Sequence, residues 1–161
     1  MEQLFESAAS THLGAADIAL RLVAAVVFGL FAGIDRELRG KAAGMRTHML
    51  VSLAAAAFTI LTFELFYRVT AADENAAADP LRIAEAVVTG VAFLGGGAII
   101  RSGGGVQGLT TGANIWLAGA IGVACGAGLY LVAAICLALA LVVLVVMGWI
   151  ERRFLGTGGP E

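Results

Sequence analysis

The sequence predicts an all-α polytopic membrane protein with about five transmembrane helices. Apolar residues make up 60% of the 161 residues, charged residues only 14%, and the mean hydropathy is +0.92. A soluble domain carries roughly 45–50% apolar and about 25% charged residues. This chain therefore has too few polar residues to cover a surface that faces water. Its net charge of −2 provides no basic field for binding nucleic acid.

Five apolar runs carry the prediction of five spans. They are 18–34, 49–66, 83–100, 113–125 and 129–150. A spanning helix needs roughly 20 mainly apolar residues. Hydrocarbon offers no partner for open backbone groups, so each run is expected to be helical. The run at 113–125 is short and contains Gly119 and Gly122, so a re-entrant segment is the alternative for this run only.

Charge near the runs predicts the domain limits and the orientation. Residues 1–17 carry Glu2 and Glu6 and no basic residue before the first run, unlike the start of a cleaved signal peptide, so the first run is expected to be retained as a span. The orientation given by the basic loops makes 1–17 an extracytoplasmic segment. Residues 18–150 form the transmembrane domain, and 151–161 a short cytoplasmic tail. Basic residues in short loops mark the cytoplasmic side. Two basic clusters, one after the first run and one after the fifth, comprise Arg36, Arg39, Lys41, Arg46, Arg152 and Arg153. The amino terminus is therefore expected outside and the carboxyl terminus in the cytoplasm.

A shift of 64 residues aligns two parts of the chain. It places Gly33 on Gly97, Gly44 on Gly108, and Thr47 on Thr111. We interpret this as a parallel two-helix repeat, spans one and two followed by spans three and four, plus a fifth helix. Such repeats are related by an axis along the membrane normal. With 22 glycines in the chain, chance alignment is the alternative.

The repeat brings two glycine-bearing loops to the cytoplasmic face, where we predict one polar cluster. Its members are Asp35, Arg36, Glu37, Arg46, Thr47, His48, Arg101, Thr110, Thr111 and Asn114. One interpretation is structural: these residues cap helix ends, and their basic members set the orientation in the membrane. A binding role, with an anionic group held at the positive end of a helix, is the other interpretation.

The segment before the third run reads as a helix start at the outer face. Asp79 is a favoured N-cap and Pro80 a favoured first helical residue. Arg82 and Glu85 are three apart and suited to pair on one helix face.

Glycines follow within the third run, and we predict that they pack helices closely. They are Gly90, Gly95, Gly96 and Gly97. An unwound segment that lines an ion path is the alternative.

The sequence contains no motif typical of a catalytic site. Cys125 and Cys136 lack the short spacing of zinc ligands and read as small hydrophobic residues. The glycine-rich loop at 101–116 has no lysine, so it is not a nucleotide-binding P-loop. We therefore expect no enzymatic activity, no metal and no cofactor.

Several motifs in register resemble the membrane domain of the MgtC/SapB family. They lie at 33–37, 44–48, 79–83, 90–97 and 108–111 with Trp116, and the resemblance covers 18–150. It implies a bacterial inner-membrane protein, tied in some members to growth in low magnesium and survival inside host cells. It also implies regulation of other membrane machines, notably the F-type ATP synthase. Many members continue into a soluble ACT-like domain. Only 154–161 follow Arg153, so we expect a short member without that domain.

These observations are compatible with two functions. The first is a regulator that binds another membrane complex through its helices. The second is a small ion transporter or channel, favoured by the repeat and the glycine-rich span ends. Five spans make a thin wall for a pathway, so the second function requires a homo-oligomer.

Overall fold

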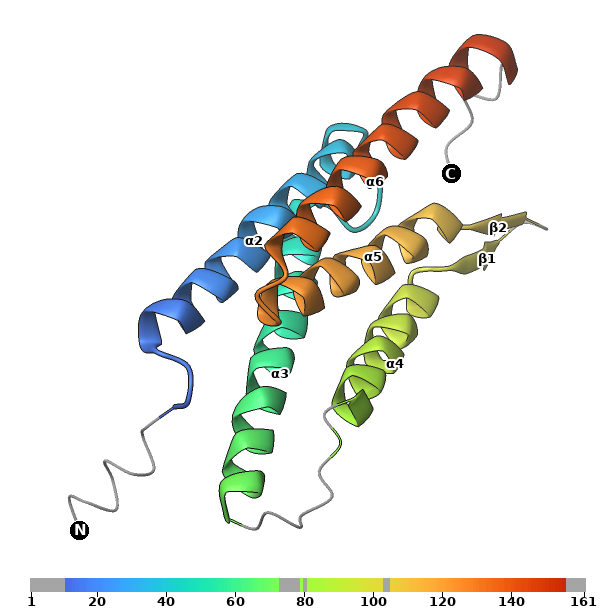
Figure 1. Ribbon diagram of the computed structural model, residues 1–161. Coiled ribbons are helices and arrows are strands. Elements are labelled where there is room, and N and C mark those ends of the chain that lie inside the picture. Colours follow the sequence, from blue (N-terminus) through green and yellow to red (C-terminus); the bar gives the residue numbers. More distant parts are fainter. Residues whose placement is uncertain (1–10, 73–78, 80, 103–104, 156–161) are drawn as a thin grey trace.

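In a computed structural model, the described part of the chain folds into a bundle of five α-helices (Figure 1). The structure describes residues 11–72, 79, 81–102 and 105–155. The helices are α2 (Ala15–Leu38), α3 (Met45–Ala72), α4 (Leu81–Gly97), α5 (Leu109–Gly126) and α6 (Tyr130–Ile150), and a short π-helix, η1 (Glu151–Leu155), continues α6. This confirms the all-α polytopic fold. Four of these helices, α2, α3, α5 and α6, are long and apolar enough to cross a membrane.

The third and fourth spans differ from the prediction. The fourth was expected to be short and broken by glycine, but α5 is a continuous helix of 18 residues that begins at Leu109. The third was expected to reach residue 100, but α4 ends at Gly97 after 17 residues. At 1.5 Å per residue α4 is about 26 Å long, shorter than a hydrocarbon core of about 30 Å. Three consecutive glycines at its end explain why α4 stops early.

A β-hairpin occupies the position where the sequence indicated a glycine-rich loop. Strands β1 (Ile100–Ser102) and β2 (Gly105–Gln107) pair antiparallel, with Arg101 opposite Val106. The hairpin extends from the bundle where α4 ends and α5 begins (Figure 1). We call this end of the bundle, where α2 and α4 end and α3 and α5 begin, the hairpin end. It is the predicted cytoplasmic end.

Helix α5 is the centre of the bundle, because it packs against all four other helices. In its most apolar stretch 61% of the residues are buried, against 11% in α6. Its side chains join two hydrophobic clusters. One cluster contains Ile121 with residues of α2, α3 and α6, and the other contains Ile115 with residues of α3 and α4. Both cysteines are free, and Cys125 is buried in the first cluster.

The glycines of α5 allow this packing. A Cβ at Gly126 would lie 2.6 Å from the carbonyl oxygen of Ala56, and one at Gly122 would overlap the carbonyl oxygen of Ser52. Small residues let neighbouring membrane helices approach to backbone contact. Of the two glycines that cast doubt on the fourth span, Gly122 therefore lets α5 approach α3, whereas a Cβ at Gly119 would lie 2.8 Å from Val91 of α4.

The helix starts agree with the 64-residue shift. Helix α3 begins at Met45 and α5 begins at Leu109, 109 − 45 = 64 residues later. The connections differ, since residues 39–44 form a short loop and 100–107 a hairpin. An axis relating the two pairs stays a prediction.

Candidate functional site

Five polar side chains are buried where α2, α3 and α5 meet. They are Arg36, His48, Ser52, Thr111 and Asn114, each at most 5% exposed. We call them the buried polar group. Burying polar atoms away from water costs free energy unless they find partners, so their contacts show what the site can do.

Two hydrogen bonds of this group join α2 to α5. The Arg36 guanidinium donates from Nη2 to the Thr111 hydroxyl. The Asn114 amide donates from Nδ2 to the carbonyl oxygen of Ala32 at 3.3 Å. Arg36 lies in the last turn of α2, where the partial negative charge of the helix end favours a cation. The contacts therefore hold a charge inside the bundle and connect two helices through it.

The α3 members of the group are less fully bonded. His48 Nδ1 lies 2.8 Å from the carbonyl oxygen of Gly44. A carbonyl only accepts, so Nδ1 carries the proton and Nε2 of a neutral ring presents a lone pair. Within the described residues neither His48 Nε2 nor the Ser52 hydroxyl has a hydrogen-bond partner. The two residues are four apart and share one face of α3.

Two acidic residues of the predicted cluster accept hydrogen bonds near helix ends. Asp35 Oδ1 accepts from Arg39 Nε at 2.8 Å, an ion pair within α2. Glu37 Oε2 accepts from the backbone N–H of Met45 at 3.0 Å, so it satisfies one open donor at the start of α3. These two acids stabilise helix ends.

The structure places the members of the predicted cluster at different depths. Arg46 is exposed, because it precedes His48 by two residues, about 200° around the helix. Thr47 is half-buried, while Thr110 is exposed and faces a groove between α5 and α6. The Arg101 side chain lies outside the described residues. Arg36, His48, Thr111 and Asn114 are the members that the fold buries together.

The outer helix start has its predicted cap geometry. Asp79 Oδ1 accepts from the backbone N–H of Leu81 at 2.9 Å. Pro80 lies outside the described residues. Arg82 and Glu85 are both exposed, and no ion pair joins them in the described part of the chain. Exposed pairs gain little free energy, so this pairing has no strong cause to form.

Only one of the four predicted packing glycines packs within the chain. A Cβ at Gly95 would lie 2.9 Å from the carbonyl oxygen of Gly112 on α5. Among the described residues, none lies within 4 Å of a Cβ placed at Gly90, Gly96 or Gly97. Helix α4 stands at the edge of the bundle (Figure 1), where it packs mainly on α5 and to a lesser extent on α3.

Sequence reasoning missed two polar contacts at the opposite end. Glu64 accepts from the backbone N–H groups of His12 and Leu13 at 2.7 and 2.8 Å. Arg21 Nη1 donates to the carbonyl oxygen of Gly126 at 2.8 Å, at the end of α5. An acid inside an apolar run was a visible signal for Glu64. Nothing in the sequence pointed to Gly126 as the partner of Arg21. Ser52 was also missed, although it lies one turn after His48.

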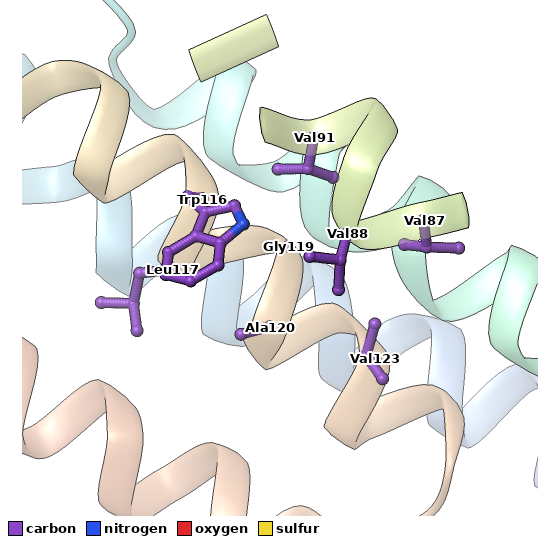
Figure 2. A pocket seen from close by; sticks show the side chains of 8 residues that line it. All are labelled: Val87, Val88, Val91, Trp116, Leu117, Gly119, Ala120 and Val123. Carbon is purple, nitrogen blue, oxygen red and sulfur yellow. The ribbon is translucent and has the colours of Figure 1, made fainter. Parts of the chain in front are cut away.

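Two grooves border α5. The α4/α5 groove has a volume of about 110 Å³, with Val88 and Trp116 facing each other across Gly119 (Figure 2). The α5/α6 groove has a volume of about 410 Å³ and includes Thr110 and Asn114. Neither groove contains an acid, a base or an activated nucleophile. Within the described residues no group of three His, Cys, Asp or Glu side chains is placed to hold a metal ion.

The chain is similar in sequence to a known family and to several of its relatives. The MgtC family model matches residues 22–153. The chain is 42% identical over 115 residues to the putative magnesium transporter YhiD of Escherichia coli K12, covering 71% of this chain and 53% of YhiD. It is 34% identical over 152 residues to protein SapB of Bacillus subtilis, covering 90% and 61%. It is 40% identical over 108 residues to protein MgtC of Brucella abortus, covering 67% and 42%.

No solved structure matches the chain. The chain spans about half the length of these curated relatives, so their full activities do not transfer to it as findings. The family match covers most of the transmembrane bundle, including the buried polar group and both grooves. The chain belongs to the MgtC family, as a multi-pass membrane protein.

Proposed function

We propose that this protein is a non-enzymatic regulator in the bacterial inner membrane, which binds another membrane complex through its helices under magnesium limitation. The link to magnesium is supported by the names of relatives, among them the putative magnesium transporter YhiD. The absence of catalytic groups from both grooves supports a binding role. The proposed orientation is amino terminus outside and carboxyl terminus in the cytoplasm.

The observation that carries the proposal is the open face of α4. Gly90, Phe93 and Gly97 recur at spacings of three and four, so they lie on one side of the helix. Phe93 is 81% exposed, and both glycines face open space. Helix association within a membrane depends on small residues and close packing, because lipid is as apolar as the side chains. A helix of another protein fits against this face at backbone distance, with Phe93 as its largest contact.

The partner implied by the family resemblance is the F-type ATP synthase, whose membrane part is itself built of helices. A regulator of this kind needs only to hold one helix of the partner. This chain offers such a face without using any residue of its buried polar group.

The test is co-purification from native membranes after growth in low magnesium. We expect Gly90→Leu with Gly97→Leu to abolish recovery of the partner, because the added side chains prevent close approach. The matched control is Ala138→Leu on the exposed face of α6, which we expect to keep the partner. A chain recovered only with itself, or equal recovery from the α4 variant and the control, would contradict the proposal.

The alternative is a small oligomeric ion transporter or channel. The buried polar group favours it, because polar residues inside a membrane bundle often mark ion pathways. Flux through the purified protein in proteoliposomes separates the two functions. The regulator predicts no flux above that of empty vesicles, and the transporter predicts flux that is lost in Arg36→Met.

A further inference from the structure

The α5/α6 groove has the shape of a site for an alkyl chain. The two helices are joined at the turn of residues 127–129 and diverge toward the hairpin end (Figure 1). Side chains of both helices line the groove between them. Its volume of about 410 Å³ lies within the range of small-molecule sites, roughly 300–1,000 Å³. The walls are aliphatic over most of their length. They comprise Leu117, Leu139, Ala140, Val143 and Leu144, with Cys136.

The groove becomes polar at one end only. Thr110 and Asn114 lie in the first two turns of α5, at the hairpin end. The deeper wall residues Leu117 and Cys136 lie closer to the turn that joins the helices. This gradient from apolar to polar matches a lipid whose chain points into the bundle and whose headgroup reaches the surface at the hairpin end.

A guanidinium stands beside the polar end. Arg39 lies against Gly148 of α6, where a Cβ would be 2.7 Å from Nη1. Gly148 is four residues beyond Leu144, so it continues the same face of α6 that lines the groove. Asp35 fixes the guanidinium through Nε at 2.8 Å, and the Arg39 side chain stays 27% exposed. The cation is therefore positioned and still accessible at the mouth of the groove.

We propose that the α5/α6 groove binds one anionic phospholipid of the leaflet at the hairpin end. One acyl chain lies along the aliphatic walls, and the phosphate accepts hydrogen bonds from Arg39. Bonds between guanidinium and phosphate are charge-assisted and stronger than neutral ones. Basic residues near the membrane surface favour anionic lipids. Arg39 lies at this end together with Lys41 in the loop after α2, Arg46 in the first turn of α3, and Arg153 in η1. A zwitterionic headgroup brings its own cation to this basic surface, so it binds less well.

The test measures lipid retained by the purified protein. Full-length protein is delipidated in detergent, incubated with phosphatidylglycerol or phosphatidylcholine, and analysed by native mass spectrometry. We expect phosphatidylglycerol to be retained in preference to phosphatidylcholine. Arg39→Gln should reduce its retention about fivefold, as expected for one cation near a membrane surface. Ala140→Phe should reduce it further by filling the groove.

Two matched controls separate this site from general attraction. Arg153→Gln removes the same charge at the same end of the bundle, and Ala120→Phe fills the α4/α5 groove instead. Both should retain phosphatidylglycerol within about twofold of the parent protein. Equal retention of the two lipids, an equal loss in Arg153→Gln, or unchanged retention in Ala140→Phe would overturn the proposal.

Two further readouts keep the test decisive. Arg39→Lys should restore part of the retention, whereas a residue needed only for folding is not rescued by charge. Excess inorganic phosphate should leave the bound lipid in place, because the acyl chain contributes to affinity. Displacement by phosphate alone, or a dimer that Ala140→Phe abolishes, would show a different occupant and overturn the proposal.

Discussion

The two helix pairs α2–α3 and α4–α5 each have a close glycine contact, but they differ in what they bury. In the first pair Gly29 contacts the backbone of His48, and in the second Gly95 contacts the backbone of Gly112. The α3 and α5 residues of these contacts are 112 − 48 = 64 positions apart, whereas the two glycines are 95 − 29 = 66 apart. The first pair buries Arg36, His48 and Ser52. In the second pair α5 is the buried centre of the bundle, whereas α4 is short and leaves Gly90, Gly96 and Gly97 open.

This difference distinguishes the three helices that stabilise the fold, α2, α3 and α5, from α4, which is available to a partner. Helices α2, α3 and α5 share glycine contacts and side-chain hydrogen bonds, so each constrains the other two. Helix α4 is attached mainly through Val87, Val91 and Gly95 on one face. Substitutions in the two regions should therefore differ in kind, with loss of folding in the first and loss of association in the second.

The largest expected effect is at Gly122. A side chain there overlaps the backbone of Ser52, so Gly122→Leu should prevent α5 from packing on α3. Overpacking costs typically about 1–3 kcal/mol, and here backbone rather than a flexible side chain must move. Gly90→Leu should leave stability unchanged. Fluorescence-detected size exclusion of detergent extracts after a temperature series checks this, and equal melting of the two variants would break the comparison.

The next effect is at the buried guanidinium. Arg36→Met should destabilise the bundle by about 1.5–3 kcal/mol, the usual value of a hydrogen bond to a charged group. Arg46→Met should change stability little, because Arg46 is exposed. The same thermal assay in detergent measures both variants. A larger loss of stability in Arg46→Met than in Arg36→Met would contradict this prediction. It would indicate that the exposed loop residues, and not the buried polar group, form the functional cluster.

A smaller and local effect is expected at the opposite end. Glu64→Gln removes the charge that accepts the backbone N–H groups of His12 and Leu13. Amide hydrogen exchange at these two residues should become about tenfold faster, since each bond to a carboxylate is worth about 1.4 kcal/mol or more. Glu85→Gln on the exposed start of α4 is the control and should change nothing. Unchanged exchange in Glu64→Gln would show that the carboxylate does not hold this segment.

Hydropathy predicted where the five described helices lie, because apolar runs must satisfy their backbone groups internally. It did not predict that only four of them are long and apolar enough to span a membrane. It did not predict which face of each helix is inside. In α3 nearly every face is apolar, so the sequence does not distinguish Arg46 from His48 by depth. The run of Gly95, Gly96 and Gly97 signalled close packing, but small residues carry the same signal for packing within a chain and between chains. Tertiary contacts decide between them.

The central claim is that α4 is the helix that binds another protein. It is tested most directly by photo-crosslinking in native membranes after growth in low magnesium. A photoreactive residue replaces Phe93 on the open face of α4 or, as the control, Val142, which is 56% exposed on α6. The account predicts a crosslink from position 93 to a second membrane protein and only lipid products from position 142. Lipid products alone from position 93, or the same protein crosslinked from both positions, would contradict it.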